Sequence, residues 1–252
     1  MTNMLSTTTK FTKGRGYELS IAENICVVKE EVRRALEESG RPGDNVTIVA
    51  VTKYSDAEAV LEAARAGQTE LAENRVQMLI EKWNALDEMR QNGIDVPEIS
   101  WHLIGHLQTN KVKYVIGKVK LIHSCDSLKL AREISQRSEK AGVVTHILIE
   151  VNVSGEESKS GVRPEEAEDL ARACAELPGV RVDGLMTMAP RDADEAFLTD
   201  IFTKTHKLFV DINKKNIYNL SMTTLSMGMS ADFVTAVKCG SNMIRVGHRI
   251  FG

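Results

Sequence analysis

Short apolar segments alternate with helical segments along almost the whole chain, and this alternation is the feature that most restricts the possible folds. The first apolar segment, residues 46–51, reads VTIVAV, and β-branched runs of this kind are typical of strands buried on both faces of a parallel sheet. The segments predicted as strands are 46–51, 70–72, 100–104, 121–123, 146–153, 182–188, 223–226 and 243–246. Helical stretches separate them, so parallel strands joined by helical crossovers are expected.

Helical periodicity and stop signals define the elements between the strands. Apolar residues recur at helical spacing between residues 17 and 38, and the sequence SGRPG at 39–43 ends this helix. The clearest later helix follows Arg163. Pro164 occupies its first position, two glutamates fill its first turn, and the Pro-Gly pair at 178–179 ends it.

Eight strands alternating with eight helices in a chain of 252 residues match a (β/α)8 barrel, which typically has about 250 residues. An open doubly wound sheet is the alternative, because alternation alone does not distinguish a closed sheet from an open one. No G-x-G-x-x-G motif follows the first strand, which removes support for a dinucleotide fold. We therefore predict an α/β protein with one (β/α)8 barrel domain over residues 17–252, preceded by a flexible tail at 1–16.

Composition excludes several classes of function. The chain has 32 basic and 35 acidic residues, a formal charge of −3, and 5% aromatic residues, which is not the profile of a nucleic-acid binder or of a polybasic membrane protein. It has no apolar run long enough to span a membrane and no signal peptide. Its cysteines, at 26, 125, 174 and 239, form no C-x-x-C pair and are expected to be reduced. We expect a cytoplasmic protein with a small-molecule site.

The site of a barrel lies at the carboxyl ends of its strands, and Lys53 directly follows the first strand. A lysine at this place is either a solvated cap of the strand or an amine held at the rim of the core. Burial favours the neutral amine, because desolvation lowers a lysine pKa. A neutral amine is what a Schiff base requires.

The segments after the last two strands suggest an anion site. The sequence SMGMS at 226–230 follows strand seven, and RVGH at 245–248 lies at the end of strand eight. Barrels often bind phosphate there through backbone N–H groups, and Gly228 and Gly247 permit close backbone approach. A helix-capping turn is the alternative. Strands one and eight are neighbours in a closed barrel, so the segments predict a ligand with both an aldehyde and a phosphate, which is pyridoxal phosphate (PLP).

Ordered sequence blocks extend this pattern over nearly the whole chain. They are VAVTK at 49–53, EN at 73–74, WHLIGHLQTNK at 101–111, HSCDS at 123–127, EVNVSGE at 150–156, SKSG at 158–161, GLMTMAP at 184–190, SMGMS at 226–230 followed by Asp232, RVG at 245–247 and IFG at 250–252. In these blocks the chain resembles the pyridoxal phosphate homeostasis proteins, single-domain barrels related to the N-terminal domain of alanine racemase.

The resemblance implies a role for particular residues. Lys53 would form the internal aldimine, Asn74 would lie beside the cofactor ring, and Arg245 would face the pyridine nitrogen. The residues implied to hold the phosphate are Ser226, Met227, Gly247 and His248, the last three through main-chain N–H groups. Two positions depart from the family pattern: Arg75 stands where tyrosine is common, and His248 stands where a small hydroxyl residue is common. The second departure leaves the backbone amide unchanged.

The resemblance also implies that the protein is not an enzyme. A guanidinium only donates hydrogen bonds, so Arg245 would keep the ring nitrogen unprotonated and weaken the ring as an electron sink. Alanine racemases take their second catalytic base from an additional β-domain of the partner subunit, and this chain ends at Gly252, directly after strand eight. We expect a monomer that holds PLP and delivers it, with apo forms of PLP-dependent enzymes as candidate partners. An amino-acid racemase or a related PLP catalyst is the alternative.

Two further segments have competing interpretations. His102 and His106 have the i, i+4 spacing that binds zinc on a helix. They flank a predicted strand end, where this spacing does not place them on one face, so we expect no metal. The polar segment 156–161 follows strand five at the site face, where it either contacts the ligand or forms a solvated loop.

Overall fold

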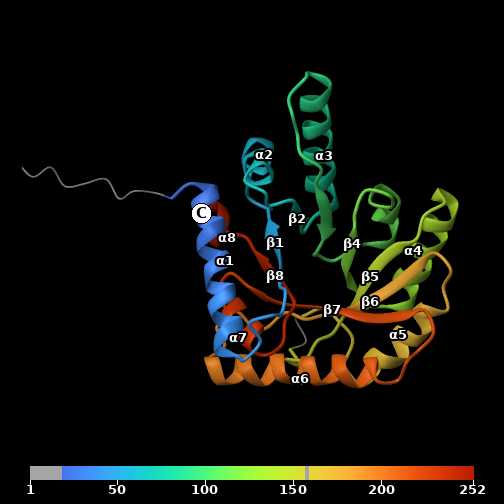
Figure 1. Cartoon of the computed structure of the whole chain (residues 1–252). Helices are drawn as coiled ribbons and strands as arrows, with labels where there is room; N and C mark the ends of the chain where they lie inside the picture. The colour runs from blue at the N-terminus through green and yellow to red at the C-terminus, as the bar shows by residue number, and fades with distance from the viewer. Residues whose placement is uncertain (1–18, 157–158) are drawn as a thin grey trace, which may run out of the picture.

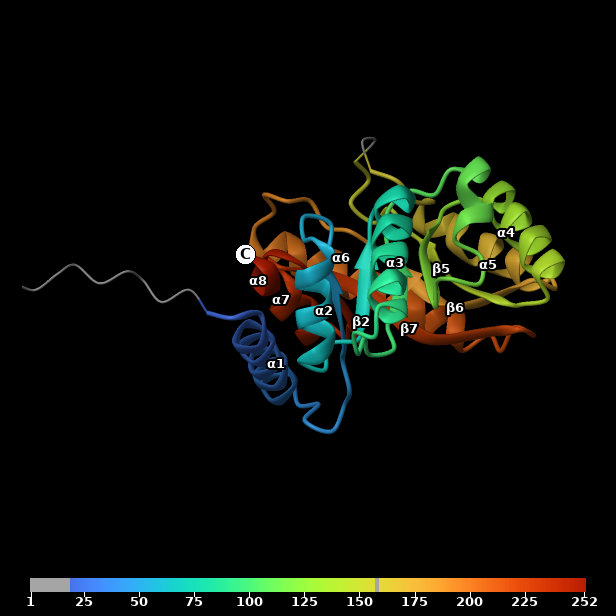
Figure 2. The ribbon, with the colours of Figure 1, turned by 90° about the horizontal axis from the view of Figure 1, so that it is seen from above.

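The computed structural model describes residues 19–156 and 159–252, and its parallel strands close into a barrel. Each strand pairs with the next, and β8 pairs with β1. Figures 1 and 2 show the strands and the helices around them from two directions. The strands are β1 Thr47–Val51, β2 Glu70–Glu73, β3 Ser100–Leu103, β4 Leu121–Cys125, β5 Thr145–Glu150, β6 Val180–Met186, β7 Leu220–Met229 and β8 Met243–Val246. The predicted barrel is confirmed and the open sheet is excluded. The tail predicted at 1–16 lies outside the described residues.

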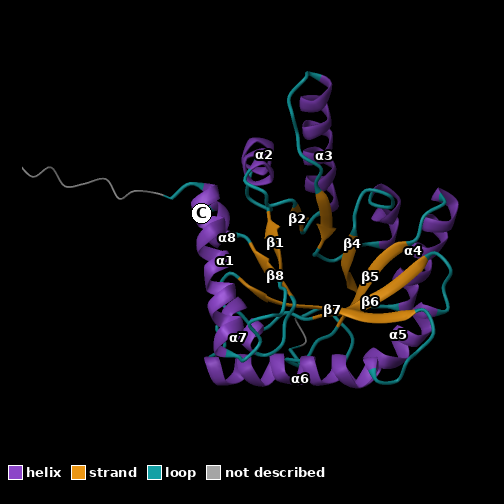
Figure 3. Cartoon of the chain, viewed as in Figure 1, coloured by secondary structure: helices purple, strands orange, loops and turns teal. Residues whose placement is uncertain are grey.

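Helices surround the strands, as Figure 3 shows by colour. They are α1 Ile21–Glu38, α2 Ala57–Arg65, α3 Val76–Gln91, α4 Leu128–Ala141, α5 Ala167–Ala175, α6 Glu195–Asn213, α7 Phe233–Lys238 and α8 His248–Phe251. Two 3-10 segments add to them: η1 Thr109–Tyr114 and η2 Pro164–Glu166. Between β3 and β4, η1 stands in place of an α-helix. Val112 is buried within η1, and Val115, which caps its carboxyl end three residues further on, is buried as well, matching the period of a 3-10 turn.

Helix α1 begins at Ile21, because Ser20 and Glu23 form a capping box. The Ser20 hydroxyl accepts from the Glu23 N–H at 3.3 Å, and Glu23 accepts from the Ser20 N–H at 2.8 Å. The sequence had predicted a start at residue 17, which lies outside the described residues. The helix packs beside α8, where Arg249 pairs with Glu31 at 2.6 Å, and Figure 1 places the end of the chain beside it.

Strand β7 is longer than the predicted 223–226, and its extra residues change which side chains face the site. The strand continues to Met229 through Gly228, which has a φ of +97°. The pairing with β8 shifts register between Ser226 and Met229, as in a β-bulge. A Cβ at Gly228 would lie 2.6 Å from the Ala236 side chain of α7, so the close approach at this glycine is to a helix.

Alternate strand residues point into the barrel, as the two-residue period of a strand requires. The apolar part of this interior consists of Val49, Val51, Ala72, Leu121, Leu148, Met186 and Met243. A second and larger apolar layer lies between the strands and the helices, and it contains residues such as Ile122, Leu185 and Met227. Within the described ranges, no helix combines the length and the apolar character needed to cross a lipid bilayer.

Candidate functional site

A cavity of about 610 Å³ lies at the carboxyl-terminal end of the barrel strands. Its wall is formed by the ends of strands and the loops that follow them. Of the residues predicted to hold a cofactor, the ones that line this cavity are Lys53, Asn74, Arg245, Gly247 and His248. Closure of the barrel thus brings together side chains from the two ends of the chain.

Strand β1 carries Lys53 to the mouth of the barrel. Val49 and Val51 point into the interior, and Lys53 continues the same alternation into the cavity wall. Its side chain is half-buried, and its Nζ lies 4.9 Å from the centre of the ring of Tyr54. Asn74 lines the cavity just beyond the neighbouring strand β2.

A buried ion pair fixes the backbone next to Lys53. Lys82 of α3 and Glu73 of β2 are in direct contact, and their side chains are 5% and 0% exposed. Lys82 Nζ also donates to the carbonyl oxygen of Thr52 at 2.6 Å, and the Thr52 hydroxyl donates to Glu73 at 2.6 Å. Because Thr52 immediately precedes Lys53, these bonds hold the end of β1 in place.

Arg245 is a buried cation at the floor of the cavity, with 3% of its surface exposed. Its Nη1 donates to the hydroxyl of Ser226 at 2.5 Å, and its Nη2 donates to the carbonyl oxygen of Thr187 at 2.9 Å. Burial lowers the pKa of Arg245 to about 10, although Asp232 and Glu150 act to raise it. The guanidinium therefore remains charged at neutral pH, with N–H groups left to donate into the cavity.

The loops after β7 and β8 meet at Ser230 and Gly247. The Gly247 N–H donates to the Ser230 hydroxyl at 3.1 Å, and both residues line the cavity. A Cβ at Gly247 would lie 3.1 Å from the carbonyl oxygen of Val51, so a side chain there would crowd β1. This convergence of a hydroxyl and main-chain N–H groups suits an anion.

Two of the predicted phosphate residues, Ser226 and Met227, do not line the cavity. Ser226 is fully buried inside the barrel, where it contacts Arg245 and His123. The Met227 side chain is buried in the outer apolar layer, as the alternation of strand residues requires. Sequence reasoning missed Ser230 as a wall residue, although it ends the same SMGMS block. Extending the two-residue alternation of the strand beyond its predicted end at residue 226 would have placed Ser230 on the inner face with Ser226. The bulge at Gly228 interrupts this alternation.

Two carboxylates in the cavity wall were also not predicted as site residues. Burial raises the pKa of Glu150 to about 7, and Asp126 raises it further while Arg245 lowers it. Burial likewise raises the pKa of Asp232, although a hydrogen bond from the Met229 N–H and the charge of Arg245 both act to lower it. The cavity wall therefore combines the cationic side chain of Arg245 with two carboxyl groups whose pKa values are raised.

The two histidines with metal-like spacing are separated. His102 lies inside the barrel and is fully buried, whereas His106 lines the cavity mouth, with its Nδ1 3.6 Å from Asp126. No group of three or more His, Cys, Asp or Glu side chains in the described part of the chain could hold a metal ion. Arg75, the departure from the family pattern, is exposed at the start of α3 and does not line the cavity.

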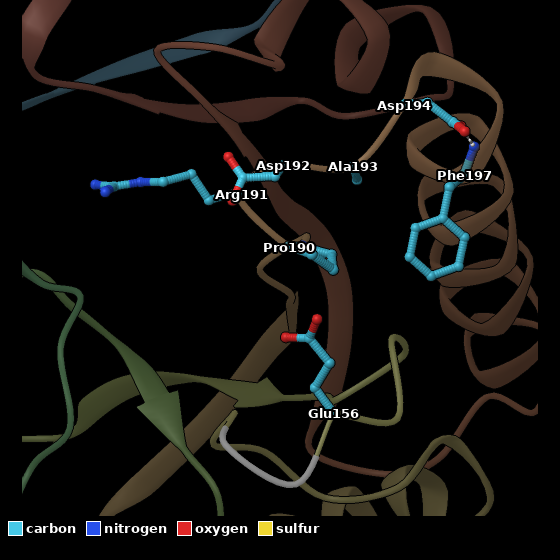
Figure 4. A pocket seen from close by; sticks show the side chains of 7 residues that line it. All are labelled: Glu156, Pro190, Arg191, Asp192, Ala193, Asp194 and Phe197. Carbon is cyan, nitrogen blue, oxygen red and sulfur yellow. Dashed lines mark hydrogen bonds between the residues drawn. The ribbon is translucent and has the colours of Figure 1, made fainter.

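A second hollow of about 630 Å³ lies beside the first, and Arg191 lines both. Figure 4 shows its acidic side chains, Glu156, Asp192 and Asp194, together with Phe197. Asp194 is engaged as the N-cap of α6 and accepts from the Phe197 N–H at 2.8 Å. Three carboxylates would repel an anion, so the first cavity is the candidate site.

The segment 156–161 contributes to the first cavity through Ser160, which lines it. Lys159 lies 4.0 Å from Glu156 across the same segment. Residues 157 and 158 lie outside the described residues.

Comparison with known proteins places this barrel in a class. The chain matches the alanine racemase N-terminal domain family over residues 27–252. A pyridoxal phosphate homeostasis protein from Aquifex aeolicus is 38% identical, with 93% of this chain and 98% of that protein covered. One from Escherichia coli K12 is 33% identical, with 92% and 96% covered. The solved structure of PipY from Synechococcus elongatus PCC7942 with PLP bound has 30% identity and a TM-score of 0.79, with 92% and 100% covered.

The class is therefore that of alanine racemase-type barrels. Within it, the chain belongs to the pyridoxal phosphate homeostasis protein family.

The raised pKa of Glu150 predicts a pH dependence of stability. An unfolded Glu ionises near its ordinary value of 4.5, whereas Glu150 in the folded chain ionises near 7. The free energy of unfolding therefore falls as the pH rises from about 4.5 to about 7, because the unfolded chain releases the Glu150 proton before the folded chain does. We expect Glu150→Gln to reduce this loss, and to gain up to about 3 kcal/mol over the wild type between pH 4.5 and pH 8 in urea unfolding. A parallel pH profile for both proteins would contradict this role of Glu150.

Proposed function

We propose that this protein binds pyridoxal phosphate in the first cavity, with a covalent link to Lys53, and acts in the homeostasis and delivery of the cofactor. One observation carries the proposal: Lys53, Arg245 and the Ser230–Gly247 contact line the same cavity. An amine, a buried cationic donor and an anion site are the groups that an aldehyde, a pyridine nitrogen and a phosphate require. PLP supplies these three functions and acts as an electrophile when bound.

The amine of Lys53 has a clear chemical task. Its nitrogen would attack the aldehyde carbon, and the carbonyl oxygen would leave as water, so that the amine becomes a Schiff base. Within the described chain, Lys53 is the only lysine in the cavity wall. Asn74, on the neighbouring strand, would lie beside the ring.

The phosphate would lie where the loops after β7 and β8 converge. Ser230 and Gly247 meet there, with the Gly247 N–H donating to the Ser230 hydroxyl, and His248 follows directly in the cavity wall, so the Ser230 hydroxyl can donate to a phosphate oxygen. Ser226 and Met227 were predicted for this task from the sequence. Ser226 is buried, which supports a different role for it, namely to contact Arg245. The role implied for the main-chain N–H of Met227 stays a prediction.

Arg245 favours binding over turnover. Its guanidinium stays protonated and can only donate, so it would leave a ring nitrogen unprotonated and reduce electron withdrawal by the ring. The relatives from Aquifex aeolicus and Escherichia coli carry the name of homeostasis proteins. An amino-acid racemase is the second candidate, favoured by the match to the alanine racemase domain. Delivery to apo forms of PLP-dependent enzymes by a cytoplasmic monomer completes the proposal.

The first test concerns the covalent link. We expect borohydride reduction of the PLP-loaded protein to attach the cofactor to Lys53, as read by peptide mass mapping. Lys53→Ala should lose covalent labelling and keep weaker binding through the anion site. Lys204→Ala, at an exposed lysine of α6, is the matched control and should be labelled normally. Label on a lysine other than Lys53 would refute this assignment.

The second test separates the two serines. Ser230→Ala should weaken PLP binding by about 1–2 kcal/mol, since one hydrogen bond to a charged group is lost, and should leave the affinity for pyridoxal unchanged. Ser226→Ala should reduce the affinities for PLP and for pyridoxal by a similar factor, because Ser226 acts through Arg245 on the ring that both ligands share. Calorimetric titration with PLP and pyridoxal measures both. If Ser226→Ala lost the preference for PLP over pyridoxal and Ser230→Ala kept it, Ser226 and not Ser230 would be the residue that contacts the phosphate.

The third test separates a binder from a racemase. We expect the PLP-loaded wild type, incubated with L-alanine in deuterated water, to exchange the α-proton no faster than free PLP. Arg245→Glu favours a protonated ring nitrogen, so preparations that remain folded should exchange faster and bind PLP more weakly. Exchange far above that of free PLP in the wild type would favour the racemase.

A further inference from the structure

A continuous chain of hydrogen-bonded side chains crosses the interior of the barrel beneath the cavity. His123 Nδ1 lies 3.0 Å from the Ser226 hydroxyl, which accepts from Arg245. His123 Nε2 lies 2.9 Å from His102 Nδ1, and His102 Nε2 lies 2.6 Å from a carboxylate oxygen of Glu70. The members come from β2, β3, β4, β7 and β8, so the chain connects distant strands.

The chain joins the two ends of the barrel. Arg245 lines the cavity at the carboxyl-terminal end, whereas Glu70 begins β2 and lines a hollow at the opposite end. Between these two, Ser226, His123 and His102 are fully buried. Glu70 has 24% of its side chain exposed and also accepts from Lys120 Nζ at 2.5 Å.

The two ends, together with neutral histidines, fix the direction of every bond between them. An arginine can only donate, and an ionised carboxylate can only accept. Burial acts to raise the pKa of Glu70, but the hydrogen bonds from His102 and Lys120 lower it overall, so Glu70 is ionised at neutral pH. A neutral imidazole has one donor and one acceptor nitrogen, so with both histidines neutral each link donates away from Arg245 and towards Glu70.

This direction determines the tautomers of both histidines. The Ser226 oxygen accepts from Arg245, and the acceptor within reach of its own proton is His123 Nδ1. His123 therefore carries its proton on Nε2 and donates to His102 Nδ1. His102 in turn carries its proton on Nε2 and donates to Glu70. A second proton on His102 would place two N–H groups face to face.

We propose that Ser226, His123, His102 and Glu70 form a one-directional hydrogen-bond chain that positions Arg245, with both histidines neutral and protonated on Nε2. Burial lowers the pKa of His123 well below its usual value, with smaller contributions from His102 and Arg245. Burial also lowers the pKa of His102, although Glu70 opposes it. Both directions agree with the neutral state on which the direction of the hydrogen bonds depends.

Arg245 needs such support because no described carboxylate forms a direct ion pair with it. The bonds from Nη1 to Ser226 and from Nη2 to Thr187 fix the plane of the guanidinium in the cavity wall, and three of its N–H donors are outside these two bonds. The hydrogen-bond chain that starts at Arg245 ends on a carboxylate at the other end of the barrel. The four residues are positioning residues, because they act on a ligand through Arg245.

The first experiment reads the tautomers directly. Long-range ¹H–¹⁵N correlation spectra of the full chain without cofactor, assigned with His102→Phe and His123→Asn, should show both imidazoles protonated on Nε2 alone at neutral pH. A proton on Nδ1 of either ring, or a doubly protonated ring, would overturn the proposal. This measurement involves no cofactor, so its outcome is independent of the proposed function.

The second experiment tests the effect on binding, and this part rests on the proposed function. His123→Asn keeps an acceptor near the Nδ1 position for Ser226, whereas His123→Gln keeps only a donor near the Nε2 position and His123→Phe keeps neither. We expect the Gln and Phe variants to lose about tenfold in affinity for both PLP and pyridoxal, and the Asn variant about threefold or less. His146→Phe is the control, because it removes the contact between His146 and Asp183, and neither residue belongs to the hydrogen-bond chain. This variant should bind PLP and pyridoxal like the wild type.

The outcomes separate the two ideas. Equal affinity in the Asn, Gln and Phe variants, or a loss confined to PLP, would overturn the positioning role. A wild type that binds no PLP would refute the proposed function, and the tautomers would still decide whether the chain exists as proposed.

Discussion

Closure of the sheet is the constraint on which the rest of this structure depends. Once β8 pairs with β1, every strand has a defined inner and outer face, and a residue two positions further along must face the same way. On β1 this rule leads from two buried valines to Lys53, and on β8 it leads from Met243 to Arg245. The amine, two residues beyond the end of β1, and the guanidinium on β8 therefore line the same cavity.

Electrostatics then decides what the mouth can hold. A buried guanidinium needs acceptors for its donors, and here the protein supplies two of them, a hydroxyl and a carbonyl oxygen, without a directly paired carboxylate. Arg245 keeps its charge available to a ligand as a result. The acids nearest to it, Glu150 and Asp232, have raised pKa values because of burial, which limits their competition for it.

Sequence patterns predicted the barrel and the place of Lys53 because both follow local rules. Asn74 and the role of Arg245 were implied by the family resemblance instead, and all three residues lie in the cavity wall. The strand end at β7 was predicted too early, because the bulge at Gly228 breaks the two-residue period, and Ser230 was missed for the same reason. The histidine chain could not be predicted. His102 and His123 meet only through the register of β3 against β4, which no local pattern of either strand contains.

The ion pair between Lys82 and Glu73 restricts how this sequence can drift over evolutionary time. Replacing one partner leaves the other charge buried, at a cost of about 3–5 kcal/mol, which is a large share of the about 5–15 kcal/mol by which most domains are stable. A lineage cannot pass through that intermediate easily, so the two positions are expected to change together or to stay as they are. Because the same pair holds the carbonyl of Thr52, descendants that keep it inherit the placement of Lys53 as well.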